Sequence, residues 1–380
     1  MEHLTEYRLE ELLEYEQPTA YIVSSTDYSD NYKTPVLTAG KSFILGYTNE
    51  TAGIFDRLPV IIFDDFTTAI QYVSFPFKVK SSAMKILHIN KNLVHPKYIF
   101  YRMQVIQFDH STHKRYWIQQ YSKIKVKIPP LPEQERIVAR IEELFSELDK
   151  AVETLNTTKQ QLAVYRQAVI STSFPELTSS NSVRLDEIAE ISGGITKGRD
   201  LSQQKTITLP YLRVANVQNG YLDLSQMKDI EVKLNEVDKY LLQEGDVLYT
   251  EGGDRDKLGR GTVWKNEIPR CVHQNHIFKA RLNQERALPQ YVAYWSMSVY
   301  ARDYFFKKGK QSVNLASINK TVLSALILPM PSLEEQASII NNIESRLSVC
   351  DQIEKTIEQS LQQAEALRQS ILKQAFEGRL

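Results

Sequence analysis

Apolar side chains recur at alternating intervals of four and three residues through the middle of the chain. From Ile137 onward, the positions on this seam are Ile137, Ile141, Leu144, Leu148, Ala151, Leu155, Thr158, Leu162, Tyr165 and Val169. Heptad spacing kept over more than four heptads is typical of a coiled coil. A helix on the surface of one domain, the alternative, usually has a wider apolar stripe. The pattern predicts a helix of about 63 Å between residues 132 and 174.

The same segment occurs a second time, 202 positions later. Residues 129–174 align with residues 331–376 without a gap, and fifteen of the forty-six pairs are identical. An ungapped repeat of this length indicates one structural unit used twice, most simply a helix. Two equal helices can lie antiparallel and bury each other's seams, with Cys350 as a core residue. The seam residues that we select are Ile141, Leu148, Leu155, Leu162, Ile343, Ile353, Ile357 and Leu367.

The segments outside the repeats have the mixed pattern of α/β domains. In the first, helical spacing at 8–15 and 95–106 accompanies strand-like stretches at 21–25, 34–38, 42–48, 60–66 and 83–90. In the second, strands are indicated at 209–217, 246–252, 261–265 and 273–282, and a helix at 288–306.

Both segments open alike, with RLEELLEY at residue 8 and RLDEIAEI at residue 184. We therefore expect a helix-led globule followed by a long helix, occurring twice. The predicted fold is α+β, a repeat of two globular α/β domains separated by two long helices that pair as an antiparallel coiled coil. The domains are placed at 1–127 and 183–328, the helices at 128–175 and 329–380, and a Pro- and Ser-containing linker at 173–182.

Charge is segregated along the chain although the net charge is zero. Residues 33–127 carry fourteen bases and five acids, and residues 183–328 carry twenty-one bases and seventeen acids. The repeats and residues 1–32 are acidic. A neutral protein with this distribution can present a polyanion-binding face on its globules. The chain contains no run of about 18 apolar residues, the length that a membrane-spanning helix needs. Its two cysteines are far apart in sequence, which suits a reducing cytoplasm.

Signatures of enzymes are weak. GKS at 40–42 lacks the earlier glycine of a phosphate-binding loop, which is Pro35 here. The glycine-rich stretch 252–261 could bind phosphates through backbone N–H groups or be a solvated hairpin loop. Asp64 with Asp65, or Glu251 with Asp254, could form a metal-dependent nuclease site, but acids at strand ends are often caps. We expect neither a metal site nor catalysis by this chain.

Basic and amide side chains on the globules point instead to nucleic-acid binding. Gln and Asn can pair bidentately with adenine edges in the major groove, and Lys and Arg bind phosphates. HKRYW at 113–117 and KKGKQSVNL at 307–315 occupy matching places before the two repeats. The candidate contacts are Lys78, Lys80, Lys114, Arg115, Arg199, Arg213, Asn216, Arg255, Lys257, Arg260, Gln274, Asn275, Lys310 and Asn314.

Several motifs together resemble the specificity (S) subunit of type I restriction-modification systems. The repeats PPLPEQERIVARIEELFSELD and PSLEEQASIINNIESRLS carry the resemblance most specifically. The stretches at 211–224, 245–261 and 273–281 resemble one type of target-recognition domain of that family, and 60–87 resembles another. The resemblance covers essentially the whole chain.

The resemblance implies a DNA-specificity subunit that reads a bipartite, gapped target, with one target-recognition domain on each half-site. The paired helices would be the spacer on which two modification (M) subunits dock, and restriction (R) subunits would join them. The chain itself would bind no cofactor, because S-adenosylmethionine for adenine methylation would belong to the M subunit. A metal-dependent nuclease and a coiled-coil adaptor that binds only proteins are the alternatives. The target bases would be determined by loop geometry and DNA shape.

Overall fold

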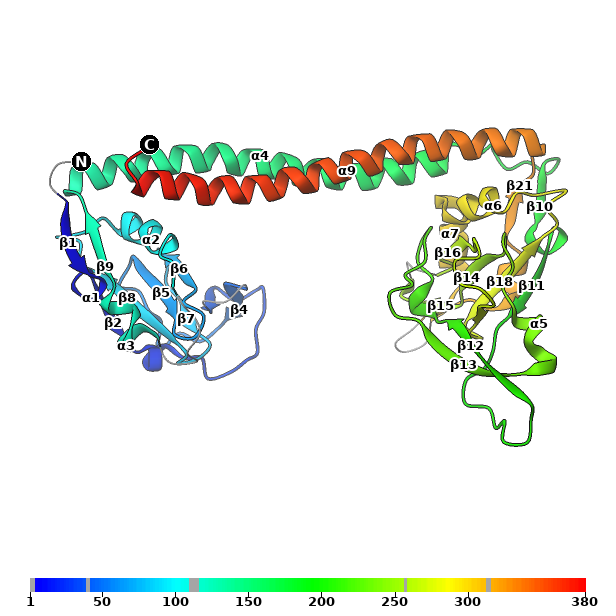
Figure 1. The fold of residues 1–380 in the computed structure, drawn as a ribbon, viewed down its shortest axis with the longest axis horizontal. Helices are drawn as coiled ribbons and strands as arrows, with labels where there is room; N and C mark the ends of the chain where they lie inside the picture. Colours follow the sequence, from blue (N-terminus) through cyan, green and yellow to red (C-terminus); the bar gives the residue numbers. More distant parts are fainter. Residues whose placement is uncertain (1–3, 39–41, 109–115, 256–257, 312–315) are drawn as a thin grey trace. The chain divides into compact units, whose positions relative to one another are not determined.

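The contacts of the computed structural model divide the chain into two compact units (Figure 1). The structure describes residues 4–38, 42–108, 116–255, 258–311 and 316–380. Unit 1 comprises residues 1–155 and 358–380, and unit 2 comprises residues 156–357. Each unit contains one globule and one end of each of two long helices, α4 (Leu131–Thr172) and α9 (Leu333–Phe376).

The two long helices pair antiparallel. In unit 1 the beginning of α4 packs against the end of α9, where Ile141 and Phe145 share a core with Ile371 and Leu372. In unit 2 the opposite ends meet, and Ile170 near the end of α4 packs with Ile343 near the start of α9. The two helices and their antiparallel pairing, predicted from the heptads, are confirmed.

The seam of the pair differs from the predicted one at some positions. Ile141, Leu162, Ile343, Ile357 and Cys350 are buried, and Leu148 and Leu155 are half-buried. Ile353 and Leu367, however, are 39% and 50% exposed, so their assignment to the seam was wrong. Tyr165 and Ala151 on α4 are likewise exposed.

Charged residues occupy the seam next to the two wrongly assigned residues: Glu354 in place of Ile353, and Arg368 in place of Leu367. The 4-3 series on α9 runs through Ile343, Leu347, Cys350, Glu354, Ile357, Leu361, Ala364, Arg368, Ile371 and Ala375, all partly or fully buried. Arg166 of α4 contacts Asp351 at 2.6 Å and Glu354 at 2.9 Å within unit 2. Within unit 1, Arg368 pairs with Asp149, and its guanidinium lies 4.4 Å from the centre of the Phe145 ring. These contacts explain why a hydrophobic pattern alone misplaced the seam.

The ion pairs of the two units are repeat equivalents. Arg166 and Arg368 are 202 positions apart, as are Asp149 and Asp351. Each unit therefore holds one copy of the same interhelical contact, with the roles of α4 and α9 exchanged.

Among the described residues of unit 1, three sheets build the globule. A four-stranded antiparallel sheet has the order β2 (Leu13–Glu16), β8 (Met84–Ile89), β5 (Val60–Asp64), β6 (Ile70–Val73). A second sheet has the order β4 (Ile44–Thr48), β3 (Thr34–Leu37), β7 (Lys78–Val79), and a third pairs β1 (Thr5–Arg8) with β9 (Lys125–Ile128). The helices of the globule are α1 (Leu9–Leu12), α2 (Pro96–Gln104) and α3 (Tyr116–Gln119), with 3-10 turns η1 (Pro18–Tyr21) and η2 (Tyr121–Lys123).

Unit 2 repeats this strand order. Its four-stranded sheet is β11 (Ala189–Gly193), β18 (Ile277–Leu282), β14 (Val247–Thr250), β16 (Gly261–Val263). The smaller sheets are β13 (Lys228–Lys233), β12 (Thr206–Leu212), β17 (Val272–His273), and β10 (Ser182–Arg184) with β21 (Ile327–Pro329). In the equivalent sheets β4–β3–β7 and β13–β12–β17, the middle and last strands, β3 with β7 and β12 with β17, are parallel. The order of strands shows that the duplication includes the globules.

Unit 2 has further elements around this frame. A small sheet has the order β15 (Gly252–Gly253), β20 (Ala316–Ser317), β19 (Lys310–Gln311). The helices and 3-10 turns are α5 (Val237–Tyr240), α6 (Pro289–Met297), α7 (Val299–Lys308), α8 (Lys320–Ser324), η3 (Leu185–Glu187), η4 (Val214–Asn216) and η5 (Leu234–Glu236).

Most predicted elements of the globules are present, with local corrections. The helix expected at 8–15 is only the single turn α1, which passes directly into β2, and 184–191 likewise becomes η3 and β11. Residues 21–25, expected as a strand, are not part of any of the strands given above. The stretch 288–306 is two helices rather than one, because Ser298 stops α6 and its side chain caps α7 by accepting from Ala301 N.

A buried glutamine at the start of each long helix fastens it to the globule. In unit 1, Gln134 Oε1 accepts from His95 N at 2.7 Å, at the N-cap of α2, while its Nε2 donates to Pro129 O. In unit 2, Gln336 Oε1 accepts from Leu288 N at 2.9 Å, at the N-cap of α6, and its Nε2 donates to Pro331 O. Each glutamine thus satisfies a free backbone donor at the start of a neighbouring helix.

Candidate functional site

Loops of unit 2 converge on a cavity of about 490 Å³. It is lined by residues from η4, from the end of β14 and β15, from the turn between β17 and β18, and from β20, namely Val214, Glu251, Gly252, Gly253, His276, Ala316 and Ser317. Volumes of this size are usual for clefts that bind ligands. We call it the Glu251–His276 cavity.

Several residues selected from the sequence adjoin this cavity. Arg213 precedes Val214, and Gln274 and Asn275 precede His276. Lys310, which is exposed, pairs in register with Ser317 across the β19–β20 ladder. Arg260 O accepts from Thr250 N, next to Glu251. Strand pairing and chain direction therefore bring together residues that were chosen from separate stretches.

Glu251 and His276 form a hydrogen-bonded pair at the cavity. Glu251 Oε2 lies 2.6 Å from His276 Nδ1, and Asn275 Nδ2 lies 3.4 Å from His276 Nε2. Their backbones are also joined, because Glu251 N donates to His276 O at 2.9 Å. From the sequence, Glu251 was expected only as a possible metal ligand, and His276 was not among the candidate contacts.

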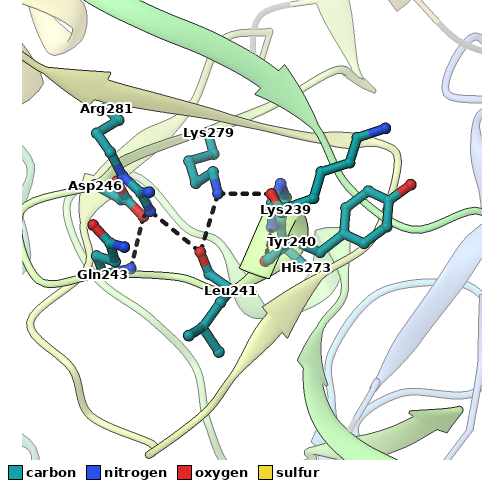
Figure 2. Close-up of polar contacts among 8 residues, drawn as sticks. All are labelled: Lys239, Tyr240, Leu241, Gln243, Asp246, His273, Lys279 and Arg281. Carbon is teal, nitrogen blue, oxygen red and sulfur yellow. Dashed lines mark hydrogen bonds and ion pairs between the residues drawn. The ribbon is translucent and has the colours of Figure 1, made fainter. Parts of the chain in front are cut away.

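A buried polar network anchors the strands on both sides of the turn that carries His276 (Figure 2). Lys279 of β18 donates to the carbonyl oxygens of Lys239 and Leu241, at 3.2 and 3.0 Å. His273 of β17 is fully buried, and its Nδ1 lies 3.1 Å from Tyr240 O. The network ties β17 and β18 to α5 and the residue that follows it.

The ionisation of this network follows from its burial. Desolvation, helped by the nearby Lys279 cation, lowers the pKa of His273 to about 3, so the imidazole is neutral. Desolvation also lowers the pKa of Lys279. Arg281 makes two 2.8 Å contacts with Asp246, and this pairing raises the pKa of the guanidinium.

The loop after β12 is shaped by Asn216, which the sequence suggested as a base contact. Asn216 is buried, its Oδ1 accepts from Arg213 N at 2.8 Å, and its Nδ2 donates to Asp223 O at 2.7 Å. Arg213 donates from Nη2 to Gln226 O at 2.6 Å. The structure therefore gives Asn216 a role in holding the loop, where its amide is already used.

The other arginines of unit 2 that were selected from the sequence, Arg199, Arg255 and Arg260, are half-buried or exposed and have partners within the unit. Arg199 pairs with Glu236 at 2.7 Å, and this hydrogen bond lowers the pKa of Glu236. Arg260 donates to Gln218 Oε1 at 3.0 Å. Arg255 is exposed, and its guanidinium lies 4.4 Å from the centre of the Phe306 ring. Contacts of this kind at or near the surface contribute little to stability.

The candidates of unit 1 divide differently. Lys80 is exposed, whereas Lys78 is buried, lies 3.0 Å from Glu50 and donates to Ala52 O. The burial of Lys78 argues against a phosphate contact. This burial could not be foreseen from the sequence, because the strand that contains Lys78 has only two residues. Lys114, Arg115, Lys257 and Asn314 lie outside the described residues.

The acids suggested for a nuclease site in unit 1 serve the fold. Asp64 Oδ1 accepts from the backbone N–H groups of Phe66 and Thr67, which caps the turn after β5. Asp65 is buried, contacts Lys85 at 3.4 Å and accepts from Trp117 N at 2.9 Å. Over the described ranges, no group of three or more His, Cys, Asp or Glu side chains is placed to hold a metal ion. Among the described helices, none is long and apolar enough to cross a membrane.

Comparisons with known proteins match both units. The family described as "Type I restriction modification DNA specificity domain" matches residues 1–162 and 179–363. The type I restriction enzyme EcoR124I/EcoR124II specificity subunit of Escherichia coli is 33% identical over 352 residues, which are 88% of this chain and 85% of that protein. The EcoKI specificity subunit of Escherichia coli K12 is 26% identical over 275 residues, 68% of this chain and 58% of that protein.

Two solved structures share the fold. A chain from work on complex assembly and conformational transition of the type I R-M system has a TM-score of 0.71 at 18% identity, covering 100% of this chain and 99% of that chain. The HsdS subunit from Thermoanaerobacter tengcongensis has a TM-score of 0.54 at 17% identity, covering 100% of this chain and 98% of that chain.

Proposed function

The chain belongs to the family of type I restriction-modification DNA specificity subunits, and we propose that each of its two units reads one half of a gapped DNA target. It acts as the DNA-specificity subunit, catalyses neither methylation nor cleavage, and assembles with modification (M) and restriction (R) subunits. We infer a cytoplasmic location, because this role would be performed on the cell's own DNA.

The internal repeat carries this proposal. Both globules have the same strand order, and both are fastened to a long helix through an equivalent glutamine, Gln134 or Gln336. Two equivalent globules with different loops can read two different half-sites. Major-groove positions on the same side of B-DNA recur about every 34 Å, so two readers held at a fixed spacing select a gapped sequence.

Recognition divides between phosphates and bases. Exposed or half-buried cations such as Lys80, Arg255, Arg260 and Lys310 would bind phosphates, which gives an affinity that falls with salt. Side chains at the Glu251–His276 cavity and on the neighbouring turn, such as Asn275, would supply contacts to base edges.

S-adenosylmethionine belongs in this proposal to the M subunit. This chain would orient the M subunit's active site on a chosen adenine by fixing the DNA. Equilibrium binding of labelled S-adenosylmethionine to the purified chain and to the complex tests the assignment, and saturable binding to the chain alone would contradict it.

Footprinting of the chain with its M subunits over a range of salt tests the function. We expect two protected half-sites separated by an unprotected gap, with an affinity that falls as salt rises. If no bipartite footprint is seen at any of the salt concentrations used, a protein-binding adaptor would be favoured. Cleavage by the pure chain with Mg²⁺ would favour a nuclease.

A further inference from the structure

The Glu251–His276 cavity contains a carboxylate where a surface built only for phosphates would not need one. The carboxylate of Glu251 is 28% exposed, and the imidazole of His276 is 54% exposed. A carboxylate facing the DNA backbone is repelled by phosphates. Its position among loops that carry Arg213, Arg255 and Lys310 therefore favours contact with something other than a phosphate.

The geometry of the pair makes it rich in hydrogen-bond acceptors. Because an ionised carboxylate only accepts, the 2.6 Å contact to Glu251 Oε2 requires His276 Nδ1 to carry the hydrogen. In the neutral imidazole, Nε2 then carries the lone pair. The amide Nδ2 of Asn275, 3.4 Å away, is on the side of that lone pair and can donate to it. The carboxylate oxygens of Glu251 therefore remain as the acceptors that the pair offers to a ligand.

The backbone holds this pair in place. Glu251 N donates to His276 O, and Glu251 O accepts from Ile318 N at 2.9 Å. Three segments, the end of β14, the turn before β18 and the residue after β20, are joined at this point. Gly252 and Gly253 line the cavity without side chains, which keeps its surface open beside the pair.

Hydrogen-bond donors on base edges in the major groove are the exocyclic amino groups of adenine N6 and cytosine N4. A carboxylate is a suitable acceptor for such a group. We propose that the Glu251–His276 cavity is a base-contact subsite that binds an exocyclic amino group of adenine or cytosine in one half-site. This inference rests on the proposed function and specifies the chemistry of the same surface.

The test measures base preference with the full-length chain and its M subunits on a library randomised in each half-site. Glu251→Gln keeps the shape of the side chain but replaces one acceptor oxygen with a donor. We expect Glu251→Gln and His276→Ala to lose at least about fivefold of the preference at one base-pair position, with the other half-site unchanged. Glu285→Gln, which changes an exposed glutamate away from the cavity, is the matched control and should keep the wild-type preference.

Base analogues identify the amino group. Purine in place of adenine, or pyrimidin-2-one in place of cytosine, at the affected position removes that group alone. Wild-type binding should fall with the analogue of whichever base the cavity binds, while Glu251→Gln should be insensitive to it.

Two results would overturn the inference. In the first, folded Glu251→Gln and His276→Ala keep the wild-type base preference at every position. In the second, these variants lose affinity equally for all sequences. A wild-type complex without any sequence preference would instead remove the proposed function, so the two failures are distinguishable.

Discussion

At the scale of single residues, buried polar side chains determine which of the selected residues remain available for DNA. Lys78 and Asn216 were selected by residue type, and both are buried and occupied by contacts within their own unit. Type and loop placement predict polarity, but burial depends on tertiary packing that a single sequence does not display. The Glu251–His276 pair was missed because its members are 25 positions apart and meet only through strand pairing.

His273 leads to a prediction on acid stability. Its pKa in the folded chain is about 3, below the ordinary value of 6.5, because burial disfavours the imidazolium. As pH falls through 6.5 the unfolded chain takes up a proton that the folded chain does not. The free energy of unfolding of unit 2 should therefore fall between pH 6.5 and pH 3, by up to about 1.4 kcal/mol per pH unit from this group.

Urea unfolding in a Trp117→Phe background, followed by the fluorescence of Trp264 and Trp295 in unit 2, measures this dependence. His273→Asn keeps an N–H donor for Tyr240 O but cannot take up the proton, so the slope should become shallower. An identical slope in wild type and His273→Asn would contradict the assignment.

At the scale of elements, the helices were predictable to within a few residues, whereas their seam was predicted only in part, because Ile353 and Leu367 do not belong to it. The 4-3 spacing and the ungapped repeat identify both helices, which run from Leu131 to Thr172 and from Leu333 to Phe376. The seam passes through Glu354 and Arg368, and their partners lie on the other helix, about 190 to 220 residues away in sequence. The repeat did contain a signal, because Arg166, Arg368, Asp149 and Asp351 are among its identities.

Two isoleucines of α9 provide a matched test of the corrected seam. Ile343 is completely buried, so Ile343→Ala should lower the free energy of unfolding by about 2–5 kcal/mol. Ile353 is 39% exposed, and Ile353→Ala should change it by about 0.5 kcal/mol or less. Chemical denaturation of the two variants gives both numbers, and equal losses would restore Ile353 to the seam.

At the scale of the whole molecule, the duplication is what the sequence displays most clearly. An offset of 202 residues relates the long helices, and the shared strand order extends the relation to globules that have little sequence in common. The identity of the globules as DNA readers could be inferred from motifs. The chemistry of the Glu251–His276 cavity could be inferred only from the structure, because strand pairing brings its residues together.

The spacer role predicts a change of gap length. Leu155 and Ile357 are repeat equivalents. Leu155 is the last residue of α4 that belongs to unit 1, and Ile357 is the last residue of α9 that belongs to unit 2. One heptad inserted after each keeps both seams in phase and lengthens the pair by about 10.5 Å. The recognised gap should grow by about three base pairs, at 3.4 Å per step.

Footprints or methylation patterns of the insertion variant measure the gap. Seven residues inserted into the exposed loop at 176–180 serve as the control and should leave the gap unchanged. A gap that stays the same when both helices are lengthened would contradict a spacer role.

The most direct test of the central claim is methylome sequencing of cells that contain this chain with its M and R partners. Two readers joined by a spacer predict one methylated motif made of two specific half-sites separated by a fixed number of unspecified bases. A single continuous motif, or methylation without sequence preference, would contradict the account.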